Sequence, residues 1–158
     1  MSEVTEDEPR IVVGVDGSRG SREALRWAAR IACAEHASIE ALGVWEPPST
    51  VTWSGVPVDS RTDAEVEKAV VDAVDSAFGA HRPTNLRLRI REGHPVPVLL
   101  DESDGALMLV VGSRGHGGFA GLLLGSVSAR VAEQARCPVL VVHDEPAMEE
   151  EHQRWITT

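Results

Sequence analysis

The part of the chain best suited to chemistry is a glycine-rich segment in its second half. Six glycines stand among residues 112–125, and Ser126 follows the last of them. A glycine-rich loop between a strand and a helix N-terminus directs several backbone N–H groups at one point, where the helix dipole also favours an anion. Glycine has no Cβ and tolerates positive φ, so a phosphate can approach the backbone closely. The segment therefore predicts a phosphate site.

The spacing of these glycines differs from that of the two common phosphate motifs. No G-x-x-x-x-G-K-[ST] occurs, so the Walker lysine is missing. A GxGxxG-like run is present, but it follows the fourth expected strand instead of opening the first βαβ unit. The pattern thus argues against a P-loop and against a dinucleotide fingerprint.

Polar residues around the segment are candidate ligand-binding groups, and each also has a purely structural interpretation. Asp16 follows the first expected strand, where Asp is commonly a turn residue or helix cap, but beside a glycine loop we favour a ligand role. Ser126 and Ser128 can cap a helix and bind phosphate at once, because both roles use the same exposed amides. Arg114 either screens phosphate charge or points to solvent. His116 has no carboxylate or second histidine near it in the sequence, which disfavours an acid–base role.

Five apolar segments of strand character alternate with segments of helical period, the pattern of βαβ units that build a parallel sheet. A strictly alternating strand at 86–91 suits an edge with one wet face. The irregular stretch 47–59 after the second strand is a candidate flap over the site. The prediction is one α/β domain with a five-stranded parallel sheet between helices, a Rossmann-like nucleotide-binding fold. Strands are expected at 10–15, 39–45, 86–91, 107–111 and 138–142, and helices at 19–36, 66–78, 95–102 and 125–136.

Length and composition limit the class of protein. A chain of 158 residues with 42% hydrophobic content matches one domain with one core. No apolar run approaches the ~20 residues that cross a bilayer, and the first ten residues are acidic, unlike a secretory signal. We therefore expect a cytoplasmic protein with no membrane partner. Cys33 and Cys137 lack CxxC spacing and a histidine cluster, so each is expected to be a small buried thiol.

The net charge of −10 is concentrated at the two ends of the chain. Residues 1–10 carry −3 and residues 144–158 carry −4, which leaves −3 on residues 11–143. We expect disordered acidic tails at 1–9 and 144–158 around a domain at 10–143. The near-neutral centre has no basic stripe and few aromatic residues, with two Phe, four Trp and no Tyr, which argues against nucleic-acid binding.

Three blocks of the sequence, in the right order, resemble the universal stress protein family. Gly112-x2-Gly115-x9-Gly125-Ser126 matches the G-x2-G-x9-G-[S/T] pattern of its nucleotide-binding members, and the match continues through VSARVAEQARCPVLVV. VVGVDGS with ALRWA resembles the family's first strand and helix, and EGHPVPVLL resembles its G-x-P segment before the third helix. The resemblance covers roughly residues 10–142 and is loose at 47–59.

The resemblance implies that ATP binds at the carboxyl ends of the strands, with Mg²⁺ helping to hold its negative charge. Asp16, with Gly14 and Val15, would lie by the adenine or ribose, and Val44 would contact the base. The two serine hydroxyls would add donors to the backbone amides of the phosphate site. That site would consist of Val111, Gly112, Gly115, Gly125, Ser126, Val127 and Ser128.

The family is also commonly dimeric through its last strand, which here runs from Pro138 to Val142. That strand is short and apolar, and we expect it at an edge of the sheet. Edge strands present unpaired backbone groups, so pairing with a second copy is independently plausible.

Binding is better supported than turnover. Phosphoryl transfer needs a positioned base and cations on the transferred phosphate, and the loop supplies no lysine clamp. The SGGxDS signature of ATP pyrophosphatases and the HxGH signature of nucleotidyl transferases are missing. Asp16-Gly17-Ser18 resembles SGGxDS only weakly. We expect an ATP-binding homodimer in stress response or signalling, at most a slow ATPase. Two alternatives stay open: a dimeric interaction module that works without nucleotide, and a cyclic AMP sensor.

Overall fold

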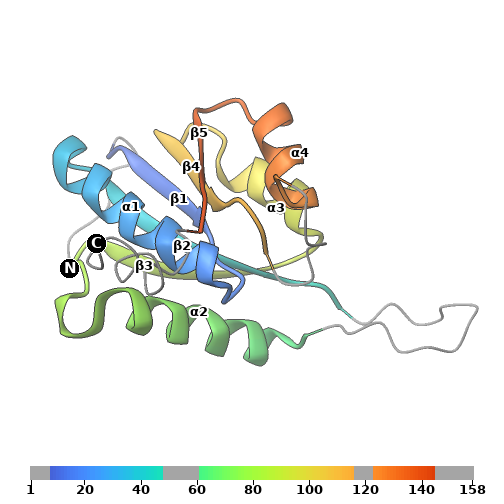
Figure 1. The fold of residues 1–158 in the computed structure, drawn as a ribbon, viewed down its shortest axis with the longest axis horizontal. Helices are drawn as coiled ribbons and strands as arrows, with labels where there is room; N and C mark the ends of the chain where they lie inside the picture. The colour runs from blue at the N-terminus through green and yellow to red at the C-terminus, as the bar shows by residue number, and fades with distance from the viewer. Residues whose placement is uncertain (1–7, 48–60, 116–122, 145–158) are drawn as a thin grey trace, which may run out of the picture.

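The computed structural model describes residues 8–47, 61–115 and 123–144 as alternating strands and helices (Figure 1). Within the described ranges, no helix is both long and apolar enough to cross a membrane. In chain order the elements are β1 (Arg10–Gly14), α1 (Arg19–Glu35), β2 (Ser38–Trp45), α2 (Asp63–Phe78), a 3-10 turn (Gly79–His81), β3 (Leu86–Glu92), α3 (Pro95–Glu102), β4 (Met108–Gly112), α4 (Ser126–Gln134) and β5 (Val139–Val142).

The five strands form one parallel sheet in the order β3-β2-β1-β4-β5. Its register is set by pairs such as Val13 with Ala41 on β2 and Val13 with Val110 on β4. The predicted class, a five-stranded parallel sheet between helices, is confirmed. The strands expected at edges, β3 and β5, are the edges of the sheet. Helix α4 is shorter than predicted, because Ala135 already has an extended backbone, with φ −64° and ψ 146°.

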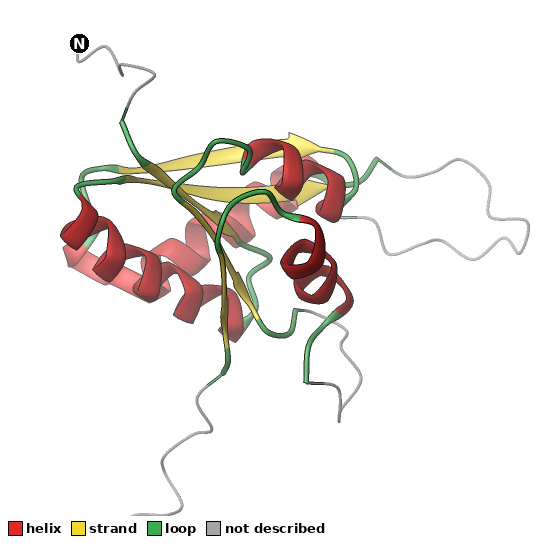
Figure 2. Ribbon diagram, turned by 90° about the horizontal axis from the view of Figure 1, so that it is seen from above, coloured by secondary structure: helices red, strands yellow, loops and turns green. Residues whose placement is uncertain are grey.

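Helices cover both faces of the sheet, with α1 and α2 on one side and α3 and α4 on the other (Figures 1 and 2). Ile11 and Val13 pack toward α1 and α2, whereas Val12 between them packs toward α3 and α4. All three are fully buried. A central strand with two covered faces must be apolar at every position, which explains the continuous run IVV in β1.

Gly43 on β2 allows α2 to lie close against the sheet. A Cβ placed on Gly43 would lie 2.6 Å from Val70 Cγ2 and 2.8 Å from Val66 Cγ1. Only a residue without a side chain fits between the strand and this helix. The close approach brings the first turns of α2 to the carboxyl end of β2.

Candidate functional site

The strand order creates a crevice at the carboxyl ends of β1 and β4. From β1 the chain proceeds to β2 and β3 on one side and later returns to place β4 and β5 on the other. The helices that follow β1 and β4 therefore cover opposite faces. In open α/β sheets such a topological switch point is where ligands bind.

A cavity of ≈ 670 Å³ occupies this position, a volume in the range of small-molecule sites. All eleven residues that the sequence singled out line it, although they come from separate parts of the chain. They are Gly14, Val15, Asp16, Val44, Val111, Gly112, Gly115, Gly125, Ser126, Val127 and Ser128.

Asp16 connects the end of β1 with the start of α1. Its Oδ1 accepts a hydrogen bond from the Ser18 amide at 2.9 Å, and Ser18 Oγ in turn accepts from the Ser21 amide at 3.2 Å, capping the helix. Gly17 stands between Asp16 and Ser18 and has φ 84°, a backbone conformation that residues with a side chain rarely adopt. Asp16 therefore both stabilises the turn between β1 and α1 and lines the cavity, so its structural and its ligand-binding interpretations are compatible.

The glycines of the site serve different purposes. A Cβ on Gly112 would lie 2.7 Å from the backbone carbon of Gly20, so Gly112 lets β4 contact the first turn of α1. A Cβ on Gly115 would lie 2.5 Å from Asp16 Oδ2, so this glycine accommodates the carboxylate. A Cβ on Gly125 would meet nothing nearer than 3.5 Å. Packing within the described residues therefore accounts for Gly112 and Gly115 but leaves Gly125 to be explained.

The N-terminus of α4 opens onto the cavity. Its N-cap is Gly125, which has no side chain to cap the helix, and the first helical bond runs from the Ala129 amide to the Gly125 carbonyl at 3.0 Å. The amides of residues 126–128 precede that bond and have no partner within the helix. An anion in the cavity would find these donors and the positive end of the helix dipole together.

The two serines of α4 differ in what their hydroxyls can do. Ser128 is buried, and its Oγ lies 2.9 Å from the Ser113 carbonyl and 3.0 Å from the Gly125 carbonyl, so its proton is donated to the backbone. Ser126 is exposed on the cavity wall. The Ser128 donor is thus engaged with the backbone, and the expectation that both hydroxyls donate to phosphate stays a prediction, in which Ser126 is the hydroxyl exposed to a ligand.

The sequence analysis missed the residues that α2 and the end of β2 contribute. Arg61, Val66 and Ala69 line the cavity, together with Glu46 and Pro47. The available signal was the pattern Thr62-x-x-Glu65, a capping box that fixes where α2 begins. Four further apolar residues of the wall were also not singled out: Leu42, Trp45, Pro95 and Leu99.

The capping box at the start of α2 is complete. The Thr62 amide donates to Glu65 Oε2 at 2.7 Å, and the Glu65 amide donates to Thr62 Oγ1 at 3.3 Å. The bond from the Thr62 backbone, followed by that from its hydroxyl, holds the pKa of Glu65 below its ordinary value. The charged carboxylate thus fixes the first turn of α2 directly after Arg61.

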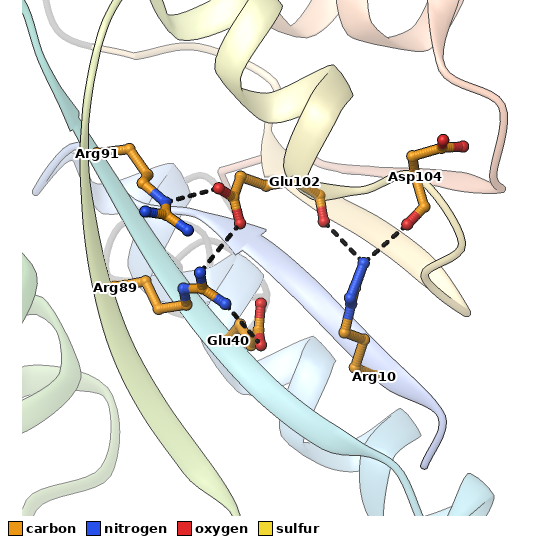
Figure 3. Close-up of polar contacts among 6 residues, drawn as sticks. All are labelled: Arg10, Glu40, Arg89, Arg91, Glu102 and Asp104. Carbon is orange, nitrogen blue, oxygen red and sulfur yellow. Dashed lines mark hydrogen bonds and ion pairs between the residues drawn. The ribbon is translucent and has the colours of Figure 1, made fainter. Parts of the chain in front are cut away.

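An ionic network holds the far end of α3 against the sheet (Figure 3). Glu102 lies 2.6 Å from Arg91 Nε and 3.6 Å from Arg89 Nη2, and Arg89 Nη1 lies 3.5 Å from Glu40 Oε1. Arg10 donates to the carbonyls of Glu102 and Asp104 at 3.1 and 2.7 Å, where a cation complements the C-terminal end of the helix dipole. Because Pro95 and Leu99 of α3 line the cavity, this network helps to position one of its walls.

Other expectations have mixed outcomes. Cys33 is exposed on α1 and Cys137 is half-buried, so the prediction of two buried thiols is wrong for Cys33. Arg114 is exposed and lines the cavity, a position compatible with both of its interpretations. His116, the proposed flap from residue 48 onward, and both acidic tails apart from residues 8, 9 and 144 lie outside the described residues.

Comparison with known proteins gives one consistent family. The model of the universal stress protein family matches residues 9–143. A universal stress protein of Mycobacterium tuberculosis strain H37Rv is 33% identical over 145 residues, which cover 87% of this chain and 48% of the relative. A second from the same strain is 36% identical over 146 residues, covering 87% and 49%. The chain thus spans about half the length of these relatives.

Solved structures show the same fold. A universal stress protein in complex with cAMP is 33% identical, with a TM-score of 0.65 and coverage of 87% of this chain and 98% of that one. The universal stress protein UspA of Lactobacillus plantarum has a TM-score of 0.67 at 22% identity, with coverage of 87% and 99%.

Proposed function

The chain belongs to the universal stress protein family, and from that premise we propose that it binds ATP in the cavity at the carboxyl ends of β1 and β4. The observation that carries this proposal is the start of α4. Uncapped amides and Gly125, a glycine that internal packing does not require, face a cavity of ≈ 670 Å³. A phosphate group satisfies those donors and explains that glycine.

The proposed pose follows the chemistry of the two ends of the cavity. The adenine and ribose lie against Gly14, Val15, Asp16 and Val44, where apolar surface is combined with one carboxylate. The phosphates lie on the glycine-rich side and at the α4 N-terminus, against Val111, Gly112, Gly115, Gly125 and the amides of residues 126–128.

Mg²⁺ is proposed to enter with the nucleotide instead of occupying a dedicated protein site. Among the described residues there is no group of three or more His, Cys, Asp or Glu side chains that could hold a metal. Mg²⁺ commonly uses one or two carboxylates, several waters and the phosphates of its nucleotide. Asp16, whose carboxylate lies beside Gly115 of the phosphate side, suits that arrangement.

We propose a binding role, with hydrolysis slow at most. The described lining residues include Arg61 and Arg114 as cations but no lysine and no histidine. Rapid phosphoryl transfer needs a group that orients water or accepts a proton, as well as charge on the transferred phosphate. A nucleotide-loaded protein that signals through its conformation or its partners fits these residues better than a fast ATPase.

The working unit is proposed to be a homodimer that acts in stress response or signalling. Strand β5 is at the edge of the sheet, and Val139, Leu140 and Val141 are only half-buried. An apolar edge strand with free backbone groups is suited to pairing with a second copy.

A cyclic AMP sensor is the second candidate. It is favoured by the 33% identical universal stress protein solved with cAMP. The same cavity would hold its adenine and single phosphate. The third possibility is an interaction module that needs no nucleotide, and the cavity at the switch point counts against it.

The experiment that separates these candidates is to denature freshly purified protein and identify the released nucleotide by mass spectrometry. The proposal predicts ATP, in a molar ratio approaching one per chain. Release of cyclic AMP instead of ATP would favour the second candidate, the cyclic AMP sensor. If no nucleotide is released and none rebinds in a titration with ATP, ADP and cyclic AMP, with and without Mg²⁺, the interaction module is the correct description.

A further inference from the structure

Arg61 is a cation on the cavity wall, and it lies outside the three sequence blocks that resemble the universal stress protein family. It lies immediately before Thr62, the N-cap of α2, and lines the cavity. It takes part in none of the ion pairs among the described residues. Its charge acts on the Glu65 carboxylate, whose pKa it helps to lower, but no ion pair within the described residues engages its guanidinium directly.

A hydrogen bond holds Arg61 at the end of β1. Its Nη1 donates to the carbonyl oxygen of Asp16 at 3.1 Å, across 45 positions of sequence. The capping box of Thr62 and Glu65 fixes the backbone directly after it. A guanidinium carries five N–H donors in a rigid plane, so one bond to a carbonyl orients the group and leaves other donors for a ligand.

Arg61 balances part of the negative charge of the cavity wall. Among the described lining residues, the acidic side chains are Asp16 and Glu46, and the basic ones are Arg61 and Arg114. The wall is thus neutral overall in a chain of net charge −10. If one of the two arginines were removed, a polyphosphate would enter a cavity whose described wall carries a net negative charge.

The two arginines reach the cavity from different segments of the chain. Arg114 belongs to the glycine-rich side, where its Cα would lie 3.6 Å from a Cβ on Gly125. Arg61 belongs to the side formed by β1 and α2. A phosphate chain running from the ribose beside Asp16 toward the α4 N-terminus would start near Arg61, which is bonded to Asp16, and end near Arg114, which lies beside Gly125.

We propose that Arg61 recognises the phosphate of the nucleotide and makes the site select phosphorylated adenosine over adenosine. This inference rests on the proposed function. Guanidinium groups bind phosphate through charge-assisted, often bidentate hydrogen bonds, and adenosine offers no such acceptor. Arg61 therefore acts on ligand choice and not on the fold.

The test is calorimetric titration of the wild type, Arg61→Gln and Arg61→Lys with adenosine, AMP and ATP. The matched control is Arg130→Gln, which removes the same charge from an exposed position on α4 outside the cavity lining. We expect Arg61→Gln to weaken ATP binding by about tenfold, the effect of losing one hydrogen bond to a charged group. Adenosine binding should stay at the wild-type level. The ATP affinity of Arg61→Lys should fall between those of the wild type and Arg61→Gln, because lysine keeps the positive charge but lacks the forked N–H donors of a guanidinium.

Several results would overturn this assignment. ATP affinity unchanged in Arg61→Gln, or equal losses for ATP and adenosine, would show that Arg61 does not recognise phosphate. The same loss in Arg130→Gln would show that the effect comes from overall charge. If the wild type binds none of the three ligands, the proposed function fails and the assignment of Arg61 fails with it.

Discussion

Gly125 and Gly112 stand thirteen positions apart in the same segment, yet they are glycine for different reasons. A Cβ on Gly112 would lie 2.7 Å from the backbone of Gly20, whereas a Cβ on Gly125 has only ordinary contacts at 3.5 Å and beyond. The first glycine joins a strand to a helix. The second has room for a Cβ, so packing does not require it: as the N-cap of α4 it is a favoured cap residue, and a close approach of a ligand is the further role that we propose.

Gly125→Ala is therefore the substitution that separates binding from folding. We expect ATP affinity to fall by about tenfold, because a methyl group would stand where the phosphate approaches the α4 amides. Stability should change by less than about 1 kcal/mol, the difference between glycine and alanine as an N-cap. Gly112→Ala should instead lower the free energy of unfolding by about 2 kcal/mol through overpacking. Calorimetry and urea unfolding of both variants measure the two effects, and wild-type ATP affinity in Gly125→Ala would contradict the ligand role.

The two serines of α4 make a second matched pair. Ser128→Ala removes a buried hydroxyl that donates to the Ser113 carbonyl and should cost about 1 kcal/mol of stability. Ser126→Ala alters an exposed hydroxyl on the cavity wall, so we expect unchanged unfolding and a several-fold loss of ATP affinity. Urea unfolding and ATP titration of both variants measure these effects. The reverse pattern, with Ser128→Ala affecting only binding, would refute this division of roles.

Local sequence patterns can identify Gly125 and Asp16 as members of one site, because a glycine loop and a strand-ending Asp have recognisable neighbours. The same patterns cannot show that Gly112 touches Gly20, since that contact joins residues 92 positions apart and depends on how α1 lies on the sheet. For Arg61 the sequence offered only part of the answer. The capping box of Thr62 and Glu65 marks where α2 begins, but the place of Arg61 on the cavity wall depends on the close packing of α2 on Gly43 and on a bond to Asp16, neither of which has a local signature.

At the scale of elements, α3 is the wall of the cavity that depends most on electrostatics. It has eight residues, and of these only Leu99 is fully buried. Its C-terminal end is held by Glu102, which bridges Arg89 and Arg91 of β3, and by the bonds from Arg10 (Figure 3). A short helix with little buried surface relies on such anchors for its position.

Glu102→Gln should loosen this anchor. We expect the free energy of unfolding to fall by about 1 kcal/mol at low salt, the upper end of the range for partly exposed ion pairs. The difference from wild type should shrink in 1 M NaCl, because screening already weakens the pairs there. Asp72→Asn, which breaks the exposed pair with Lys68 on α2, is the control and should have a smaller effect. Equal stability of wild type and Glu102→Gln at low salt would show that the network does not hold α3.

The existence and type of these elements could be predicted because buried parallel strands are continuously apolar and the helices between them keep a 3.6-residue period. The end of α4 could not, since residues up to Arg136 continue the helical composition and the turn at Ala135 comes from the path of the chain toward β5. The network of Arg89, Arg91 and Glu102 could not be predicted either. The alternation of β3 indicated a polar face, but the partner of that face is set by where α3 packs.

For the molecule as a whole, the proposed dimer depends on the open edge of β5. The carbonyls of Pro138 and Val142 accept bonds from β4, and bonding alternates along a parallel strand. The backbone groups of Val139 and Val141 are therefore directed away from β4, toward the open edge. The edge position was foreseen from a short apolar strand that begins with proline, whereas the strand order that puts it there needed the full topology.

The dimer proposal predicts a mass in light scattering of twice the 17.0 kDa of one chain. Val141→Pro removes one outward N–H and should shift the equilibrium to monomers, while the bonds to β4 remain. In the wild-type dimer, the amides of Val139 and Val141 should exchange slowly with deuterium and become fast on dilution. A monomeric wild type, or fast exchange at these two amides in a dimer, would rule out pairing through β5.

Titration of nucleotide-free protein with ATP and Mg²⁺ asks whether the cavity between β1 and β4 is a nucleotide site. We expect one site per chain with micromolar or tighter affinity, weakened in Gly125→Ala and retained in Arg130→Gln. No heat of binding up to millimolar ATP, or binding that Gly125→Ala leaves intact, would contradict it.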